Sequence, residues 1–152
     1  MKKISLLFLC LLMLVGCTSE AKTFEKISKQ YVQNYYYGER EKILTELAHK
    51  DYYVYNYINN KENAIEGAKI NGDKEYNDNL ANNIEYKYVK YEIVHRDTKE
   101  EIDRFNQLSH RNFSEMVTIV LTIEKYQNNT LINEVKKQLL LVKDGGKWSL
   151  LK

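Results

Sequence analysis

The sequence predicts an α+β fold, in which N-terminal helices pack on a curved antiparallel sheet. Between residues 23 and 50, apolar residues recur every three or four positions, which is the period of an amphipathic helix. In the C-terminal third, apolar and polar residues alternate, which is the period of a half-buried strand. Helical patterns therefore come first and strand patterns last, and short turns between the strands favour an antiparallel meander.

Two helices are expected first, joined at Gly38. Phe24, Ile27 and Tyr31 lie on one apolar stripe of the first helix. Gly38 follows this stripe at the position where a glycine commonly ends a helix. The helical pattern then restarts over 39–50.

The segment 51–58 leaves two alternatives open. Its tyrosines favour a strand by propensity, and a strand would place Tyr53, Tyr55 and Tyr57 on one face. A third helical turn could occupy the same residues. The following segments are predicted as a weak helix over 61–70, a turn at Asn71-Gly72-Asp73, and a loop or short helix over 74–83.

The rest of the chain is predicted as strands interrupted by one helix. A strand is expected over 84–95, and Thr98 with Glu101 has the spacing of a capping box that begins a short helix. Three further strands are expected, separated by the turn signals Asn128-Asn129 and Asp144-Gly145-Gly146: they cover 117–124, 131–142 and 147–152.

The N-terminus has the parts of a secretory signal peptide. Lys2 and Lys3 precede the apolar segment Ile4 to Val15, which would rise only about 18 Å as a helix. The hydrocarbon core of a bilayer is about 30 Å thick, so this segment is too short to span it. Two alternative interpretations of the N-terminus are a membrane-spanning helix and the signal peptide of an ordinary secreted protein, in which Cys17 would have no role.

The residues Leu14-Val15-Gly16-Cys17 resemble the lipobox of bacterial lipoproteins, in which the cysteine is acylated and becomes the first mature residue. The resemblance implies a protein held by lipid on Cys17 at the outer face of the cytoplasmic membrane of a Gram-positive-like bacterium. It also implies three segments: a signal peptide over 1–16, a lipidated tether over 17–22, and a single α+β domain over 23–152.

A second resemblance concerns the domain itself. The helix pair carries Tyr35-Tyr36-Tyr37-Gly38, Lys42-Ile43-Leu44 and Leu47-Ala48, and the chain ends with Val142-Lys143-Asp144-Gly145-Gly146-Lys147-Trp148-Ser149-Leu150-Leu151. A helix hairpin followed by strands that close on Gly-x-Trp-x-Leu is similar to the nuclear-transport-factor-2-like, cystatin-like fold. The resemblance implies a cone-shaped pocket between sheet and helices, with Trp148 as part of the core.

Composition excludes several kinds of chemistry. Loss of the signal peptide removes two of the 23 basic side chains and leaves them equal to the 21 acidic ones, which argues against a nucleic-acid partner. Cys10 would be discarded and Cys17 lipidated, so no thiol remains for a disulfide, a metal or a nucleophile. The three histidines do not have the spacing of metal ligands: His49, His95 and His110. We expect no metal, no cofactor and no catalytic residues.

The tyrosines are the main compositional excess, with 13 in the chain. A tyrosine combines an apolar ring with a hydrogen-bonding tip, which suits sugars and protein interfaces, although it is equally common in half-buried structure. If the excess is functional, Tyr53, Tyr55 and Tyr57 are the expected binding residues. We expect a non-enzymatic binding or assembly module with an unknown protein or cell-wall glycan partner. The alternatives are a small-ligand carrier and, on the same scaffold, a hydrolase or isomerase.

Overall fold

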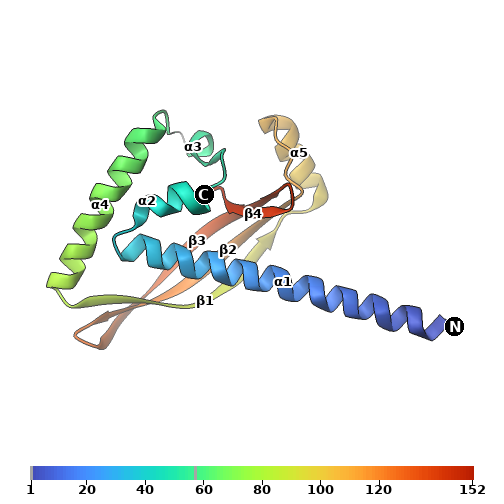
Figure 1. Cartoon of the computed structure of the whole chain (residues 1–152), viewed down its shortest axis with the longest axis horizontal. Coiled ribbons are helices and arrows are strands. Elements are labelled where there is room, and N and C mark those ends of the chain that lie inside the picture. The colour runs from blue at the N-terminus through green and yellow to red at the C-terminus, as the bar shows by residue number, and fades with distance from the viewer. Residues whose placement is uncertain (1, 57) are drawn as a thin grey trace.

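A four-stranded antiparallel sheet with helices along one face and at both ends forms the body of the protein (Figure 1). The computed structural model describes the backbone of residues 2–56 and 58–152 and the side chains of residues 19–56 and 58–152. The elements are α1 (Lys2–Tyr36), α2 (Arg40–Lys42), a π-helical turn η1 (Ile43–Leu47), α3 (Tyr52–Tyr55), α4 (Lys61–Ala81), β1 (Ile84–Arg96), α5 (Lys99–Ser109), β2 (Glu115–Gln127), β3 (Thr130–Asp144) and β4 (Lys147–Leu150).

The sheet is the predicted meander, with strand order β1-β2-β3-β4 and every pair antiparallel. Asn128 and Asn129 make the two-residue turn between β2 and β3, both with positive φ, of 49° and 63°. Two register shifts in the β1–β2 pair, at Tyr88/Lys90 and at Ile93/His95, bend β1 and so curve the sheet. The predicted α+β fold of helices on a curved antiparallel sheet is confirmed.

Helix α1 crosses the apolar face of this sheet (Figure 1). Phe24 is fully buried, and its ring meets the ring of Trp148 edge-on at 4.8 Å between centroids. The alternating side chains of β2 complete this layer, and all four are fully buried: Val117, Ile119, Leu121 and Ile123. The prediction that Trp148 packs in the core is confirmed, because it is only 9% exposed.

The predicted helix break at Gly38 is also confirmed. Helix α1 ends at Tyr36, and Gly38 has a φ of 85°, which glycine adopts without steric cost. A Cβ at Gly38 would lie 3.2 Å from the Tyr76 ring of α4, so the glycine also leaves room for that ring. The next residues turn back as α2 and η1.

Helix α5 begins at the predicted capping box. The Thr98 side chain accepts a hydrogen bond from the backbone N–H of Glu101, and the Glu101 carboxylate accepts one from the backbone N–H of Thr98. The helix covers a second, smaller core, which is formed by Ile102, Phe113, Met116, Val142 and Leu151.

In the middle of the chain the structure decides one open alternative and contradicts one prediction. Residues 52–55 form the short helix α3 rather than a strand, so the helical alternative holds. The turn at Asn71-Gly72-Asp73 does not form, because α4 runs without interruption from Lys61 to Ala81. Gly72 is needed instead for close approach between helices, since a Cβ there would meet Arg40 Cβ at 2.9 Å.

Residues 17–22 continue α1, and their C-terminal half already touches the sheet. The Tyr91 hydroxyl donates a hydrogen bond to the carbonyl of Ala21 at 3.2 Å, and Arg96 forms an ion pair with Glu20. In the part of the chain that the structure describes, no helix is both long and apolar enough to cross a bilayer.

We predict that Phe24→Ala lowers the free energy of unfolding by about 3–5 kcal/mol, because it removes a fully buried ring and leaves a cavity beside Trp148. Lys26→Ala, on the exposed side of the same helix, should change it by no more than about 0.5 kcal/mol. Urea denaturation followed by circular dichroism measures both. Equally small effects would mean that this part of α1 is not part of the core.

Candidate functional site

An open cleft of about 460 Å³ lies where the C-terminal ends of α1 and α4 meet the start of β1 and the β2–β3 turn. Its size is within the range of small-ligand sites. Three stretches distant in sequence contribute its walls: Tyr36, Tyr37, Tyr76, Asn79, Leu80, Asn83, Ile84, Glu85, Tyr86, Asn128 and Asn129.

Tyrosine rings form one side of this cleft. Tyr36 of α1 stacks on Tyr86 of β1, with ring centroids 3.9 Å apart. The Tyr37 hydroxyl donates a hydrogen bond of 2.7 Å to the Tyr86 carbonyl, and its ring lies 6.1 Å from that of Tyr76. These contacts join α1, α4 and β1, so the aromatic wall is held from three directions.

Two tyrosine hydroxyls of the cleft, those of Tyr36 and Tyr37, have raised pKa values. Burial, and next the neighbouring Tyr35, raise the pKa of Tyr36 to about 12. Burial also raises the pKa of Tyr37. These two hydroxyls therefore remain neutral hydrogen-bonding groups at neutral pH.

Asn79 of α4 provides a polar group without a partner. Its side chain is buried, with 8% of the residue exposed, and its amide nitrogen donates no hydrogen bond to any residue that the structure describes. An unsatisfied buried donor is uncommon and costs free energy, so it calls for an explanation. An acceptor supplied by a ligand in the cleft would satisfy it.

The rim is made of asparagines in unusual backbone conformations. Asn83 has a φ of 52°, and its carbonyl accepts a hydrogen bond of 3.0 Å from the backbone N–H of Asn128. This bond ties the α4–β1 connection to the β2–β3 turn. Asparagine tolerates positive φ better than most residues, and its amide leaves both a donor and an acceptor at the rim.

The predicted row of Tyr53, Tyr55 and Tyr57 does not form. Tyr53 faces the interior with 8% exposed, and its hydroxyl donates to the Leu44 carbonyl at 3.0 Å. Tyr55 is 36% exposed and its ring lies near Phe105. Tyr57 lies outside the residues that the structure describes. A helical turn places residues two apart on different sides, which separates side chains that a strand would have aligned.

His49 is held by two aspartates, one close to it in sequence and one distant. Its Nδ1 accepts the backbone N–H of Asp51 at 3.1 Å, so Nε2 carries the proton and donates to Asp144 Oδ2 at 3.1 Å. This hydrogen bond, followed by the charge of Lys50, lowers the pKa of Asp144. Both ring nitrogens are occupied and the residue is 7% exposed, so His49 clamps the segment after η1 to the β3–β4 turn and is not placed to move protons.

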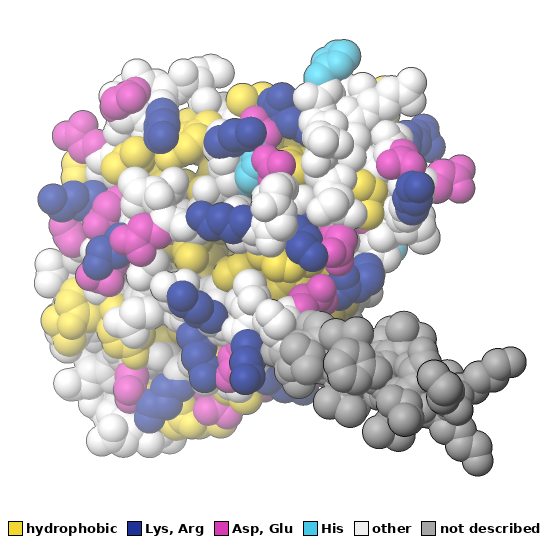
Figure 2. Space-filling model, turned by 45° about the vertical axis from the view of Figure 1, so that its right-hand side comes forward, with side chains coloured by type: hydrophobic (Ala, Val, Ile, Leu, Met, Phe, Trp, Pro, Cys, Tyr) yellow, Lys and Arg dark blue, Asp and Glu magenta, His cyan; other side chains and the backbone are white. Residues whose placement is uncertain are grey.

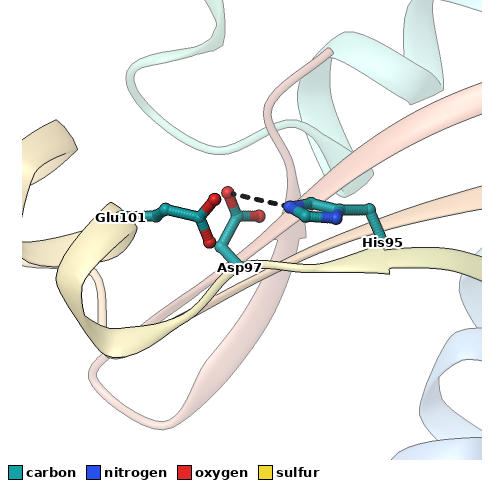
Figure 3. Close-up of side chains that lie close together, drawn as sticks. All are labelled: His95, Asp97 and Glu101. Atoms are coloured by element: carbon teal, nitrogen blue, oxygen red, sulfur yellow. Dashed lines mark ion pairs between the residues drawn. The ribbon is translucent and has the colours of Figure 1, made fainter.

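A third polar cluster joins the end of β1 to the first turn of α5 (Figure 3). One possible ligand atom from each of His95, Asp97 and Glu101 lies within 4.8 Å of the others. The sequence search for His-x-x-x-His could not detect it. The Glu101 carboxylate is already engaged by Thr98, which lowers its pKa. A cation here would compete with that cap and with the positive end of the helix dipole. We therefore assign this cluster to capping α5.

Cys17 lies in α1, among residues whose side chains the structure does not describe. Sequence reasoning missed the cleft because Tyr76 and Asn79 fall in a segment that was predicted to be a loop or short helix. The one sequence signal that marks its position is the concentration of asparagines before the first strand and at the turn Asn128-Asn129, to which no function was assigned from the sequence.

The reassignment of the tyrosine row gives a direct prediction. Tyr53→Ala should lower the free energy of unfolding by about 3–5 kcal/mol, because a buried ring is removed. Tyr55→Ala should cost about 1 kcal/mol or less, because the ring is partly in solvent. Thermal melts of the two variants compare them, and indistinguishable melts would contradict the helical placement of these residues.

Comparisons with known proteins do not identify a family or a function for this chain. No protein-family model matches the chain, and no curated protein matches it. Among solved structures, it is similar to the crystal structure of the intermembrane space region of chloroplast protein ARC6, with 9% sequence identity and a TM-score of 0.37 over 87% of this chain and 92% of that chain. The functional assignment is therefore based on the residues of this chain alone.

Proposed function

We propose that this protein is a lipoprotein of the outer face of the cytoplasmic membrane and that its domain is a non-enzymatic binding module. The proposed anchor is lipid on Cys17, supported by the lipobox-like residues that end there. The proposed binding site is the tyrosine and asparagine cleft. The observation that carries the binding site is the buried, unpartnered amide of Asn79 beneath an open aromatic cleft.

The position of the cleft suits a tethered binder. Glu20 and Ala21 contact the far half of β1, at Arg96 and Tyr91, whereas the cleft is built at the start of the same strand. The two ends of β1 are roughly 40 Å apart at the usual rise of a strand. A lipid on Cys17 would hold one end of the body close to the bilayer and leave the cleft facing away from it.

Binding is favoured over catalysis by the residues available. Among the described residues that line the cleft there is no histidine, lysine or arginine, and Glu85 is the one carboxylate. General acid–base chemistry needs a group whose pKa is matched to its task, paired with a partner in reach of the substrate. The cleft instead offers aromatic surface and amides, which recognise a ligand without transforming it.

The small-ligand carrier is the second candidate, because the cleft is open and of suitable size. The interior between α1 and the sheet does not support it. That space is filled by fully buried side chains of both layers, including Phe24, Ile119 and Leu139. A carrier would therefore have to use the outer cleft, which would leave much of a bound ligand in contact with solvent.

The anchor is tested by Cys17→Ser, with Cys10→Ser as a matched control within the same N-terminal segment. We expect Cys17→Ser to move the protein from the membrane fraction to the medium, because a stable membrane attachment needs the acyl chains. Cys10→Ser should stay with the membrane. Mass spectrometry of the native N-terminus should find a lipidated residue 17. Retention of both variants in the membrane would contradict the proposed anchor.

The binding site is tested with native protein extracted in detergent and mixed with purified cell-wall material or cross-linked in intact cells. We expect Asn79→Ala and Tyr76→Ala to reduce retention on the wall, or cross-linking to one stoichiometric partner, at least about tenfold. Asn77→Ala, an exposed asparagine of the same helix outside the cleft, is the control and should behave as the parent. Unchanged retention in all three variants would contradict the proposal that the cleft is the binding site.

A further inference from the structure

We propose that the occupant of this cleft is a neutral glycan whose sugar units carry an acetamido group. This inference rests on the proposed function, since it names the ligand class of the same site. Three properties of the cleft support it: its charge, its aromatic surface and its unpartnered amide.

The charge of the cleft favours a neutral occupant over an anionic one. Phosphates and carboxylates are bound in proteins by arginine, lysine or the start of a helix. None of these cations occurs among the described lining residues, and the one charged group is the Glu85 carboxylate. The α4 end at the cleft is its C-terminal end, which carries the negative end of the helix dipole. A neutral ligand with hydroxyl donors fits this field.

The aromatic side favours a ring with one apolar face. The stacking of Tyr36 on Tyr86 covers one face of each ring and fixes both, and the Tyr37 and Tyr76 rings lie 6.1 Å apart, so the aromatic wall is in position before a ligand arrives. A pyranose ring presents a face of C–H groups to such surfaces and hydroxyls at its edge. Those hydroxyls would meet Glu85 and the rim asparagines, which offer acceptors and donors.

The acetamido group accounts for the remaining feature, the Asn79 amide. The terminal torsion of asparagine is soft, so a small rotation turns its N–H towards an acceptor in the cleft. The carbonyl of an acetamido group is a strong acceptor that would satisfy this donor. A sugar with a hydroxyl in place of the acetamido group would lack this carbonyl acceptor.

A peptide could also supply amides, but the cleft suits it less well. Peptide partners are usually held by an apolar side chain buried in a pocket or by pairing with a strand edge. The aliphatic side chains among the described lining residues are Leu80 and Ile84, and Leu80 is 55% exposed. No deep apolar pocket is therefore formed by the described residues of the cleft.

The test titrates the native, detergent-solubilised protein with tetra-N-acetylchitotetraose and with cellotetraose, followed by calorimetry or saturation-transfer NMR. The two sugars share ring, linkage and length and differ at the acetamido group. We expect the acetylated sugar to bind at least about tenfold more tightly. Asn79→Asp keeps the shape of the side chain but removes its N–H donor, and should abolish this preference. Asn77→Ala should retain it, and a thermal melt of each variant checks folding.

Each other outcome decides against the inference. Equal affinity for the two sugars would contradict the proposed recognition of the acetamido group. No sugar binding, with wall retention that still depends on Asn79, would overturn the glycan and leave the binding module standing. Displacement from the wall by tetra-alanine but not by either sugar would assign the cleft to a peptide. Loss of both sugar binding and Asn79-dependent retention would overturn the inference and the proposed function together.

Discussion

The contact between α1 and the inner face of the sheet is the constraint on which the other elements depend. A meander of four strands leaves one apolar face without cover, and β2 is fully buried on that face only because α1 lies across it. The edge-on contact of Phe24 with Trp148 joins the middle of the covering helix to the last strand. The core therefore extends from the first turns after Cys17 to the C-terminus.

The cleft is a consequence of where this covering helix stops. Helix α1 ends at Tyr36, while β1 begins at Ile84 and the β2–β3 turn extends beyond it (Figure 1). The tyrosines at the end of α1 are thus covered on one side by β1. Their other side borders the open cleft, and α4 forms the opposite wall of that cleft. The exposed charges elsewhere are mixed in sign on the face shown in Figure 2, which gives that face no single-sign patch.

Patterns of local origin could be predicted from the sequence. The alternation in β2 and β3, the turn at Asn128 and the capping box at Thr98 depend on neighbours in the chain, and each formed as expected. Tyr53 could not be placed this way, because its β propensity was outweighed by burial of its ring and by the hydrogen bond from its hydroxyl to Leu44. Asn79 could not either, because its unpartnered state depends on elements far away in sequence.

Gly72 shows how the cleft is controlled from outside it. Arg40 lies 4.0 Å above the Tyr35 ring, pairs with Glu75 at 2.6 Å and occupies the space that a methyl group on Gly72 would need. This glycine lets α4 rest directly against the chain that follows α1, and so fixes how far apart the two walls stand. The absent side chain of Gly72 thus sets the width of the cleft from behind α4. A substitution at this position would change that width, and with it the size of ligand accepted, without changing any residue that contacts the ligand.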